Sequence, residues 1–301
     1  MLEKFICPDN QEIDTKECLQ KCRLGERCMS LPMLGSMAKQ RVWRGVPSTT
    51  QLLNGTYESF LKIITGYSKS PDELVFATLG TGIHAHLDTA KMSGVFTEED
   101  MGVFESEDGV TGRPDMVTDE DDKITLWDYK VAGSFKVASA LGLSFRHEQS
   151  TTDFYKQKSY VKDSEGNTTA FEKGSPKMIK VWYADPAKAD TFEWNMQLNY
   201  YRIMFEKKMG VKIAALKIQV IVRDGGIAMA LERGITKRAY VIDIPILDDT
   251  YAEGYFIEKK AHLEEALKRF DWDEKCSDRE TWNGRKCKDF CDVRHVCKFN
   301  K

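Results

Sequence analysis

The chain has 301 residues, is 42% hydrophobic and 30% charged, and carries a formal net charge of −3. No stretch approaches the roughly 20 apolar residues that a membrane-spanning helix needs, and the first residues lack the apolar core of a secretory signal. We therefore expect a globular protein of the cytoplasm, with no membrane partner and with reduced thiols. The charge excludes a polycation, so any binding of nucleic acid would depend on locally concentrated Lys and Arg.

Two sets of four cysteines, one near each end of the chain, share the same internal spacing. The first set is Cys7, Cys18, Cys22 and Cys28, and the second is Cys276, Cys287, Cys291 and Cys297. In both sets the gaps are ten, three and five residues, which scattered or merely buried thiols would not reproduce. Each set predicts one four-thiolate site, suited to zinc or to a [4Fe–4S] cluster. Disulfides in a secreted protein, and exchange of ligands between the two sets, are the alternatives.

Between the cysteine sets, the pattern of apolar residues predicts alternating helices and strands. The first half predicts helices over 51–64 and 73–92 and short strands over 95–96, 102–104, 113–117 and 124–130. The second half predicts a helix over 191–208, strands over 211–223 and 240–246, and a helix over 249–270. The polar segment 144–175, which contains several turn-forming residues, predicts a loop or flap.

A basic stretch overlaps that polar segment. It contains Lys156, Lys158, Lys162, Lys173, Lys177 and Lys180, interspersed with aromatic residues. A second, shorter group is Lys207, Lys208 and Lys212. Either group could contact phosphates, and a solvated surface explains each of them equally well.

The strands at 113–117 and 124–130 are joined by the polar turn 118–123, which predicts an antiparallel hairpin. A turn centred on 121 and 122 would place Asp115 opposite Asp128, and the alternation of side chains would put Lys130 on the same face as Asp128. Two carboxylates and a lysine could hold Mg²⁺ or Mn²⁺ and act on a water beside it. The alternative is a surface charge ladder, in which Arg113 and Lys123 neutralise the carboxylates.

Four groups of residues, in order along the chain, resemble the motifs of a known family. They are Gly80 to His84, Gly112-Arg113-Pro114-Asp115 with Asp128-Tyr129-Lys130, Gln197 to Tyr201, and Cys287 to Cys297. The second group is similar to the signature of the PD-(D/E)XK nuclease superfamily. The first and third are similar to the G-x-x-x-H and Q-x-x-x-Y motifs of its RecB-like branch, and the last resembles the cysteine cluster of CRISPR-adaptation exonucleases. The chain thus resembles this branch, and within it a phage-type exonuclease.

This resemblance implies a fold, a metal site and roles for particular residues. The implied fold is α/β, a restriction-endonuclease-like core with a mixed central sheet flanked by helices, plus two cysteine-rich metal modules at the termini. The implied ligands of a catalytic Mg²⁺ or Mn²⁺ are His84, Asp115, Asp128 and the carbonyl of Tyr129. Lys130 would act on the water, and Gln197 and Tyr201 would position the substrate or the hairpin.

The cysteines depart from the pattern of that family in two ways. Its late cysteines are spaced C-x2-C-x5-C, whereas the gap between Cys287 and Cys291 is three residues. Its early cysteine follows a segment similar to 47–52, and Asn54-Gly55-Thr56 stands in that place here. Cys276 could therefore supply the fourth ligand of the late site. The resemblance favours [4Fe–4S] clusters at both sets, with Zn²⁺ as the alternative.

We expect three parts: a four-cysteine metal module over 1–39, a PD-(D/E)XK nuclease core over 40–272, and a second four-cysteine module over 273–301. The expected function is Mg²⁺- or Mn²⁺-dependent hydrolysis of phosphodiester bonds, as an exonuclease at free or single-stranded DNA ends in recombination, repair or phage DNA metabolism. A phage-encoded protein would act in the host cytoplasm. The alternative is a non-catalytic nucleic-acid-binding or accessory protein of a recombination or CRISPR-adaptation complex. Because the chain has no G-x-x-x-x-G-K-[ST] motif, a helicase or a recombinase would be a separate partner.

Overall fold

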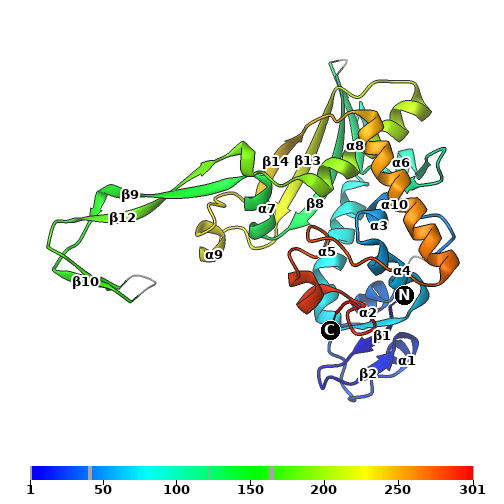
Figure 1. Ribbon diagram of the computed structural model, residues 1–301, viewed down its shortest axis with the longest axis horizontal. Helices are drawn as coiled ribbons and strands as arrows, with labels where there is room; N and C mark the ends of the chain where they lie inside the picture. Colours follow the sequence, from blue (N-terminus) through cyan, green and yellow to red (C-terminus); the bar gives the residue numbers. More distant parts are fainter. Residues whose placement is uncertain (1, 40–42, 122, 163–165, 301) are drawn as a thin grey trace. The chain divides into compact units, whose positions relative to one another are not determined.

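The computed structural model describes residues 2–39, 43–121, 123–162 and 166–300 (Figure 1). The chain forms two compact units. The first unit comprises residues 1–131, 192–221 and 240–301, and the second comprises 132–191 and 222–239. Both cysteine sets fall in the first unit. Among the described residues, no helix is both long enough and apolar enough to cross a bilayer.

A five-stranded mixed sheet is the centre of the first unit. Its strands, in spatial order, are β14 (Ala239–Ile244), β13 (Ala215–Val222), β8 (Lys123–Ala132), β7 (Met116–Glu120) and β4 (Val95–Thr97). The last three pair antiparallel. The amide of Ala214 donates to the carbonyl of Ile124, and that of Arg223 to the carbonyl of Ala132, so β13 runs parallel to β8. The sequence of β13 explains its place, because every second side chain is buried.

Helices flank this sheet, as expected for the α/β class (Figure 1). They are α3 (Thr49–Leu52), α4 (Thr56–Ile64), α5 (Pro71–Leu87), α6 (Glu98–Met101), α8 (Phe192–Met209) and α10 (Asp249–Arg269). α10 packs against both α4 and α8, and the rings of Phe256 and Tyr200 meet with their centroids 4.4 Å apart. The prediction of one helix over 51–64 was wrong. The chain breaks it at 53–55, where the absence of a side chain at Gly55 leaves room for Cys276.

The predicted hairpin is present, with the expected register. β7 and β8 pair antiparallel from Met116 opposite Trp127 to Glu120 opposite Lys123. Asp121 begins the turn with a φ of 52°, a left-handed conformation that Asp tolerates better than most residues. Since Asp115 and Asp128 each lie one residue beyond the Met116–Trp127 pair, they stand opposite one another at the end of the ladder.

The N-terminal residues form a small sheet with its own core. The strands are β1 (Leu2–Ile6), β2 (Glu12–Asp14) and β3 (Tyr67–Lys69), in the order β2-β1-β3. Two helices, α1 (Thr15–Gln20) and α2 (Leu31–Met37), accompany them. The buried side chains are Leu2, Phe5, Ile13, Cys18, Leu34 and Met37. Because β3 pairs with β1 and α2 contacts α5, this sheet is joined to the rest of the first unit.

The second unit consists mainly of paired strands. β9 (Leu143–Phe154) pairs antiparallel with β12 (Pro176–Ala184), and β10 (Ser159–Lys162) with β11 (Thr168–Phe171). Three short helices complete it: α7 (Ser134–Ala140), the 3-10 turn η1 (Pro186–Lys188) and α9 (Ala228–Leu231). The segment 144–175 was predicted to be a loop or flap. The loop was wrong, because paired strands occupy most of this segment. Polar and apolar residues are exposed on both sides of these strands, so the sequence lacks the alternation that a half-buried strand shows.

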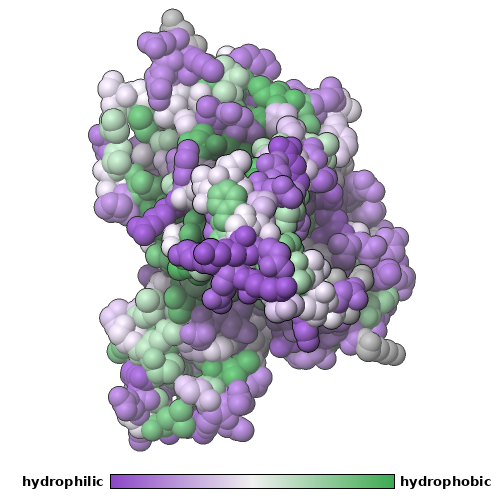
Figure 2. Space-filling view, turned by 90° about the vertical axis from the view of Figure 1, so that its left-hand side faces the viewer, coloured by the Kyte–Doolittle hydropathy of each residue, from purple (hydrophilic) through white to green (hydrophobic). Residues whose placement is uncertain are grey.

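Large apolar side chains are also exposed outside the core. Figure 2 shows one face of the molecule, on which hydrophobic residues (green) lie among hydrophilic ones (purple). Among the described residues, those of the second unit with 40% or more of their surface exposed include Phe145, Phe154, Tyr160, Val161, Met178, Ile179 and Tyr183. All of these lie on β9, β10 or β12.

Candidate metal centre

The end of the hairpin places the first predicted ligand. Asp115 directly precedes β7 and is only 8% exposed. Its Oδ2 accepts a hydrogen bond of 2.6 Å from the backbone amide of Tyr129, the residue after Asp128. This bond fixes the carboxylate across the end of the ladder and leaves Oδ1 free to contact another group.

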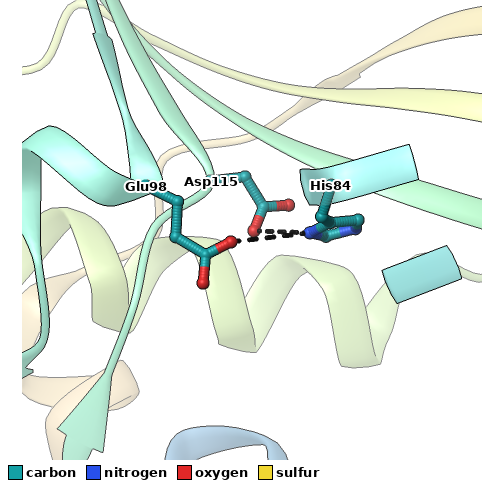
Figure 3. A group of neighbouring side chains, drawn as sticks. All are labelled: His84, Glu98 and Asp115. Atoms are coloured by element: carbon teal, nitrogen blue, oxygen red, sulfur yellow. Dashed lines mark ion pairs between the residues drawn. The ribbon is translucent and has the colours of Figure 1, made fainter. Parts of the chain in front are cut away.

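His84 approaches the same carboxylate from α5. Its Nδ1 lies 3.3 Å from Oδ1 of Asp115 and 3.8 Å from Oε2 of Glu98 (Figure 3). Its other ring nitrogen, Nε2, lies 3.2 Å from the carbonyl oxygen of Tyr129. The structure therefore gathers three of the four expected ligand groups: the imidazole, one carboxylate and the backbone carbonyl. His86, two residues further along α5, is exposed.

Glu98 is a member of this group that sequence reasoning missed. The ligand atoms of His84, Glu98 and Asp115 all lie within 4.8 Å of one another, a spacing that allows one metal ion to bind all three. Glu98 begins α6, whose start is fixed by a capping box between Thr97 and Asp100. That Thr-x-x-Asp pattern is visible in the sequence and marks the residues after it as the start of a helix.

Arg113 holds Glu98 in place. Its Nη1 lies 2.9 Å from Oε1 of Glu98, and its Nη2 donates to the backbone carbonyl of the same residue at 3.3 Å. The carboxylate oxygen on the other side, Oε2, faces His84 (Figure 3). The alternative of a charge ladder had assigned Arg113 to the hairpin carboxylates, but among the described contacts it pairs with Glu98.

A second chain of contacts runs from Asp128 to α8. Asp128 is 2% exposed, and its Oδ2 lies 2.5 Å from Nζ of Lys130. Nζ of Lys130 also donates to Oε1 of Gln197 at 3.0 Å. The amide nitrogen of Gln197 donates to the hydroxyl of Tyr201 at 2.9 Å and to Oγ1 of Thr50 at 3.2 Å. Gln197 and Tyr201, one helical turn apart, thus act together to hold the end of Lys130.

The close approach of α8 to the segment around Gly112 makes this arrangement possible. Gly112 ends the short strand β6 (Thr111–Gly112), which pairs with β5 (Phe104–Glu105). A Cβ atom at Gly112 would lie 2.3 Å from Cε of Met204 and 2.7 Å from the ring of Tyr201. Only glycine therefore allows α8 to come this close to the segment that leads into Asp115.

The environment of this site shifts the pKa values of His84, Asp128 and Lys130. Hydrogen bonding to Asp115, and then to Glu98, raises the pKa of His84 to about 10. Burial, opposed by Lys130 and reinforced by Asp115, raises the pKa of Asp128 to about 7. Burial alone would lower the pKa of Lys130, but the neighbouring Asp128 and Asp115 carboxylates outweigh it and raise that pKa. Carboxylates packed this closely need a cation near them.

The donor set fits a divalent ion. Carboxylate oxygens of Asp115 and Glu98, with Nδ1 of His84, suit Mg²⁺ or Mn²⁺. The Tyr129 carbonyl faces the other ring nitrogen of His84, Nε2. Asp128 lies next to this group. Its buried Oδ2 accepts no hydrogen bond from the described residues but lies 2.5 Å from Nζ of Lys130. Together these residues could hold a metal ion and bring a lysine beside it.

Proton release should accompany metal binding at this site. At pH 8, Asp128 is largely ionised, whereas His84, with a pKa of about 10, still carries a proton that an ion must displace. We expect about one proton released per Mn²⁺ bound, and an affinity that rises with pH up to about 10. Calorimetric titration in buffers of different ionisation enthalpy measures this number. His84→Ala should abolish the release and His86→Ala should not; binding without release would contradict the assignment of His84.

The second cysteine set converges on one pocket in the first unit. Its four thiols, those of Cys276, Cys287, Cys291 and Cys297, line this pocket together with side chains of α4. Cys276 packs against the start of α4, where a Cβ atom at Gly55 would lie 2.1 Å from its Sγ. Burial raises the pKa of Cys276 to about 11 and also raises that of Cys291. The position of Gly55, which the sequence pattern aligned with the early cysteine of the resembled family, is thus next to Cys276.

A network of ion pairs ties this pocket to α4. Glu58, buried on α4, lies 2.6 Å from Nζ of Lys286 and 2.8 Å from Nζ of Lys62. Lys62 also pairs with Asp292 at 3.0 Å. Among the described residues after Trp272, the regular structure is one π-helical turn, η2 (Lys286–Phe290). Regular secondary structure thus contributes little to the stability of this segment.

The first cysteine set surrounds α1. Cys18 is buried in the small core, and Cys7 packs against the same core. Burial raises the pKa of Cys18, and the nearby thiols of Cys7, Cys28 and Cys22 raise it further. Arg27 closes the end of α1, because its guanidinium donates to the carbonyls of Cys18, Leu19 and Gln20. The four thiols of the first set therefore lie near one another, as do the four thiols of the second set.

Comparison with known proteins gives little further information. No protein-family profile matches the chain, and no curated protein sequence matches it. Among solved structures it is similar to a protein from Eubacterium rectale named as a "putative exonuclease". The two share 13% identity over 85% of this chain and 77% of that chain, with a TM-score of 0.30. So low a score supports no inference about function, and the geometry of the site carries the conclusions below.

Proposed function

We propose that this protein is a nuclease that uses Mg²⁺ or Mn²⁺ to hydrolyse phosphodiester bonds in DNA. The observation that carries the proposal is the meeting of His84, Glu98 and Asp115 within 4.8 Å, beside the buried pair of Asp128 and Lys130. An ordinary salt bridge on the surface needs only one acid and one base. A metal-dependent site for phosphoryl transfer needs carboxylates that bind the ion and a positive group beside it, as found here.

Each residue has a task in this proposal. His84, Asp115 and Glu98 would hold the ion, with Asp128 beside them. The carbonyl of Tyr129, which faces Nε2 of His84, is the further ligand that the resemblance implies. The bound ion would stabilise charge on the phosphate and acidify the attacking water. Lys130 is held between Asp128 and Gln197, and its pKa is raised, so it carries a proton at neutral pH. It therefore donates hydrogen bonds to the water or to the phosphate oxygens rather than removing a proton.

The cysteine sets would hold metal groups that stabilise the fold. Four thiolates can bind either Zn²⁺ or a [4Fe–4S] cluster. The resemblance of the late cysteines to those of the CRISPR-adaptation exonucleases favours a [4Fe–4S] cluster at each set, with Zn²⁺ as the alternative. Coordination would then supply folding free energy that these short segments lack.

The resemblance to the RecB-like branch refines the proposal to an exonuclease acting on free or single-stranded DNA ends, with any helicase or recombinase as a separate partner. A cleavage assay tests both the nuclease activity and its restriction to free ends. End-labelled single strands, blunt duplexes and covalently closed circles are incubated with Mn²⁺ or Mg²⁺. We expect the linear substrates to be degraded, the closed circles to persist, and chelation by EDTA to stop the reaction.

Two variants on the same hairpin make this assay specific. Asp115→Ala removes a ligand and should lower the rate by at least about 10²-fold, since metal ions contribute several kcal/mol to such reactions. Asp119→Ala changes an exposed carboxylate on β7 and should leave the rate unchanged. Equal rates in wild type and both variants, with the fold intact, would reject the nuclease proposal.

A further inference from the structure

The paired strands of the second unit form a ribbon, here called the arm, which comprises residues 143–162 and 166–184. Its base is the pairing of β9 with β12, from Ala184 opposite Leu143 to Pro176 opposite Phe154. The amide of Tyr155 donates to the carbonyl of Ser175, and the amide of Gly174 donates to the carbonyl of Tyr155. These bonds continue the ribbon towards β10 and β11 (Figure 1). A two-stranded ribbon gains little stability from its own packing. Its exposed aromatic residues therefore need another explanation.

Basic residues are concentrated on this arm. The segment 143–184 contains seven Lys and Arg and five Asp and Glu, a net charge of +2, in a chain whose total is −3. The rest of the chain therefore carries −5. In the described residues from 154 to 180 there are six lysines and one acid, Glu172. The arm is thus the basic part of a protein that is otherwise acidic.

Four of these six lysines form no ion pair with the acids that the structure describes. Lys158 pairs with Glu172 at 2.7 Å, and Lys177 pairs with Asp153 at 3.0 Å. The other four have no carboxylate partner among the described residues; they are Lys156, Lys162, Lys173 and Lys180. Four exposed ammonium groups on one ribbon form a surface that attracts phosphates.

Aromatic rings lie between the lysines. On one face of the ribbon, Lys180 is paired with His147 and Trp182 with Phe145. Nζ of Lys180 lies 4.7 Å from the centroid of the Phe145 ring, which in turn lies 5.2 Å from that of Trp182. Nearer β10, Tyr155 stacks on Phe171 at 4.9 Å. Tyr160 is 67% exposed, so most of its ring is open to solvent.

We propose that the arm is a binding surface for single-stranded DNA. Lysines would contact the phosphates, and exposed rings such as that of Tyr160 would stack on unpaired bases, a combination typical of proteins that bind single strands. The choice of DNA rests on the proposed function, but the arm would bind without cleaving. A duplex hides its base faces, so it would use the lysines alone.

The test is binding of labelled oligothymidylate and of a blunt duplex of equal length, measured by fluorescence anisotropy on the full chain without added divalent cation. One variant changes to Gln the four lysines that have no described carboxylate partner, Lys156, Lys162, Lys173 and Lys180. Its matched control changes four exposed lysines of the first unit, Lys16, Lys123, Lys268 and Lys275, to Gln. A third variant is Tyr160→Ser. Circular dichroism and thermal unfolding confirm that each variant is folded.

The arm variant should bind oligothymidylate at least about tenfold more weakly than the control. The slope of the logarithm of its binding constant against the logarithm of the salt concentration should be less steep by roughly 3. Tyr160→Ser should weaken binding of the single strand about fivefold or more and leave the duplex unchanged. Equal binding by the arm variant and its control, or no effect of Tyr160→Ser on the single strand, would overturn the proposal. The proposal would also be overturned if the wild-type protein formed concentration-dependent dimers that the arm variant does not form, while both bound DNA equally.

These outcomes separate the arm from the metal centre. If the arm variant binds normally but Asp115→Ala abolishes cleavage, the nuclease proposal survives and the arm proposal fails. If the arm variant loses binding while no metal ion supports cleavage, the arm proposal survives and the nuclease proposal fails.

Discussion

Replacement of Lys130 by Met should lower the rate of Mn²⁺-dependent DNA cleavage by about 10²- to 10⁴-fold, the usual contribution of a positioned proton donor. Methionine keeps most of the aliphatic chain but removes the ammonium group that joins Asp128 to Gln197. Because that group would act on the reacting water or phosphate, the loss should fall on kcat and leave KM within about threefold of the wild-type value.

Lys123→Met is the matched control, because Lys123 lies on the same strand and is exposed. It should cleave DNA at the wild-type rate. Lys130→Met also leaves Asp128 buried without its partner. The free energy of unfolding of this variant should therefore be about 3 kcal/mol lower than that of the wild type without metal, and should recover when Mn²⁺ is added. A variant that keeps more than about a tenth of the wild-type kcat would show that Lys130 does not take part in the reaction.

Replacement of Cys276 by Ser should lower the free energy of unfolding by about 3 kcal/mol or more. The thiol lies against Gly55 at the start of α4 and lines the pocket formed by the second cysteine set. Removing one of four ligands would release the bound metal group, and η2 would then be held mainly by the Glu58 ion pairs. Thermal unfolding measures the loss of stability.

The same variant tests which metal group is present. Anaerobically purified wild-type protein should be brown and contain iron and sulfide, whereas a zinc site would be colourless. Cys276→Ser should lose part of the iron, and Asp278→Ala, an exposed change in the same loop, should retain all of it. Wild-type stability in Cys276→Ser, or an unchanged metal content, would contradict a metal site at the second cysteine set.

Local patterns in the sequence were sufficient to predict the hairpin of the candidate site. The position of the turn fixes the register, and the register places Asp115 opposite Asp128. Helical spacing likewise placed Gln197 and Tyr201 on one face of α8, where they now share a hydrogen bond. These predictions depend only on residues close together in the chain.

Features that depend on distant parts of the chain were not predictable in the same way. Glu98 becomes a candidate ligand because α6 and α5 bring it to His84, which no local pattern reveals. The contact of Gly55 with Cys276, at the other end of the sequence, is likewise not revealed by a local pattern. The arm lacks a buried face, so its strands carry no alternation of polar and apolar residues.

The position of a bound ion tests the central claim most directly. Crystals soaked with Mn²⁺ and measured near its absorption edge give an anomalous peak at each ion. We expect a peak between His84, Asp115 and Glu98, with metal–ligand distances of about 2.1 Å, and no peak there in Asp115→Ala. A peak elsewhere, or an ion that contacts neither His84 nor Asp115, would contradict the proposed metal centre.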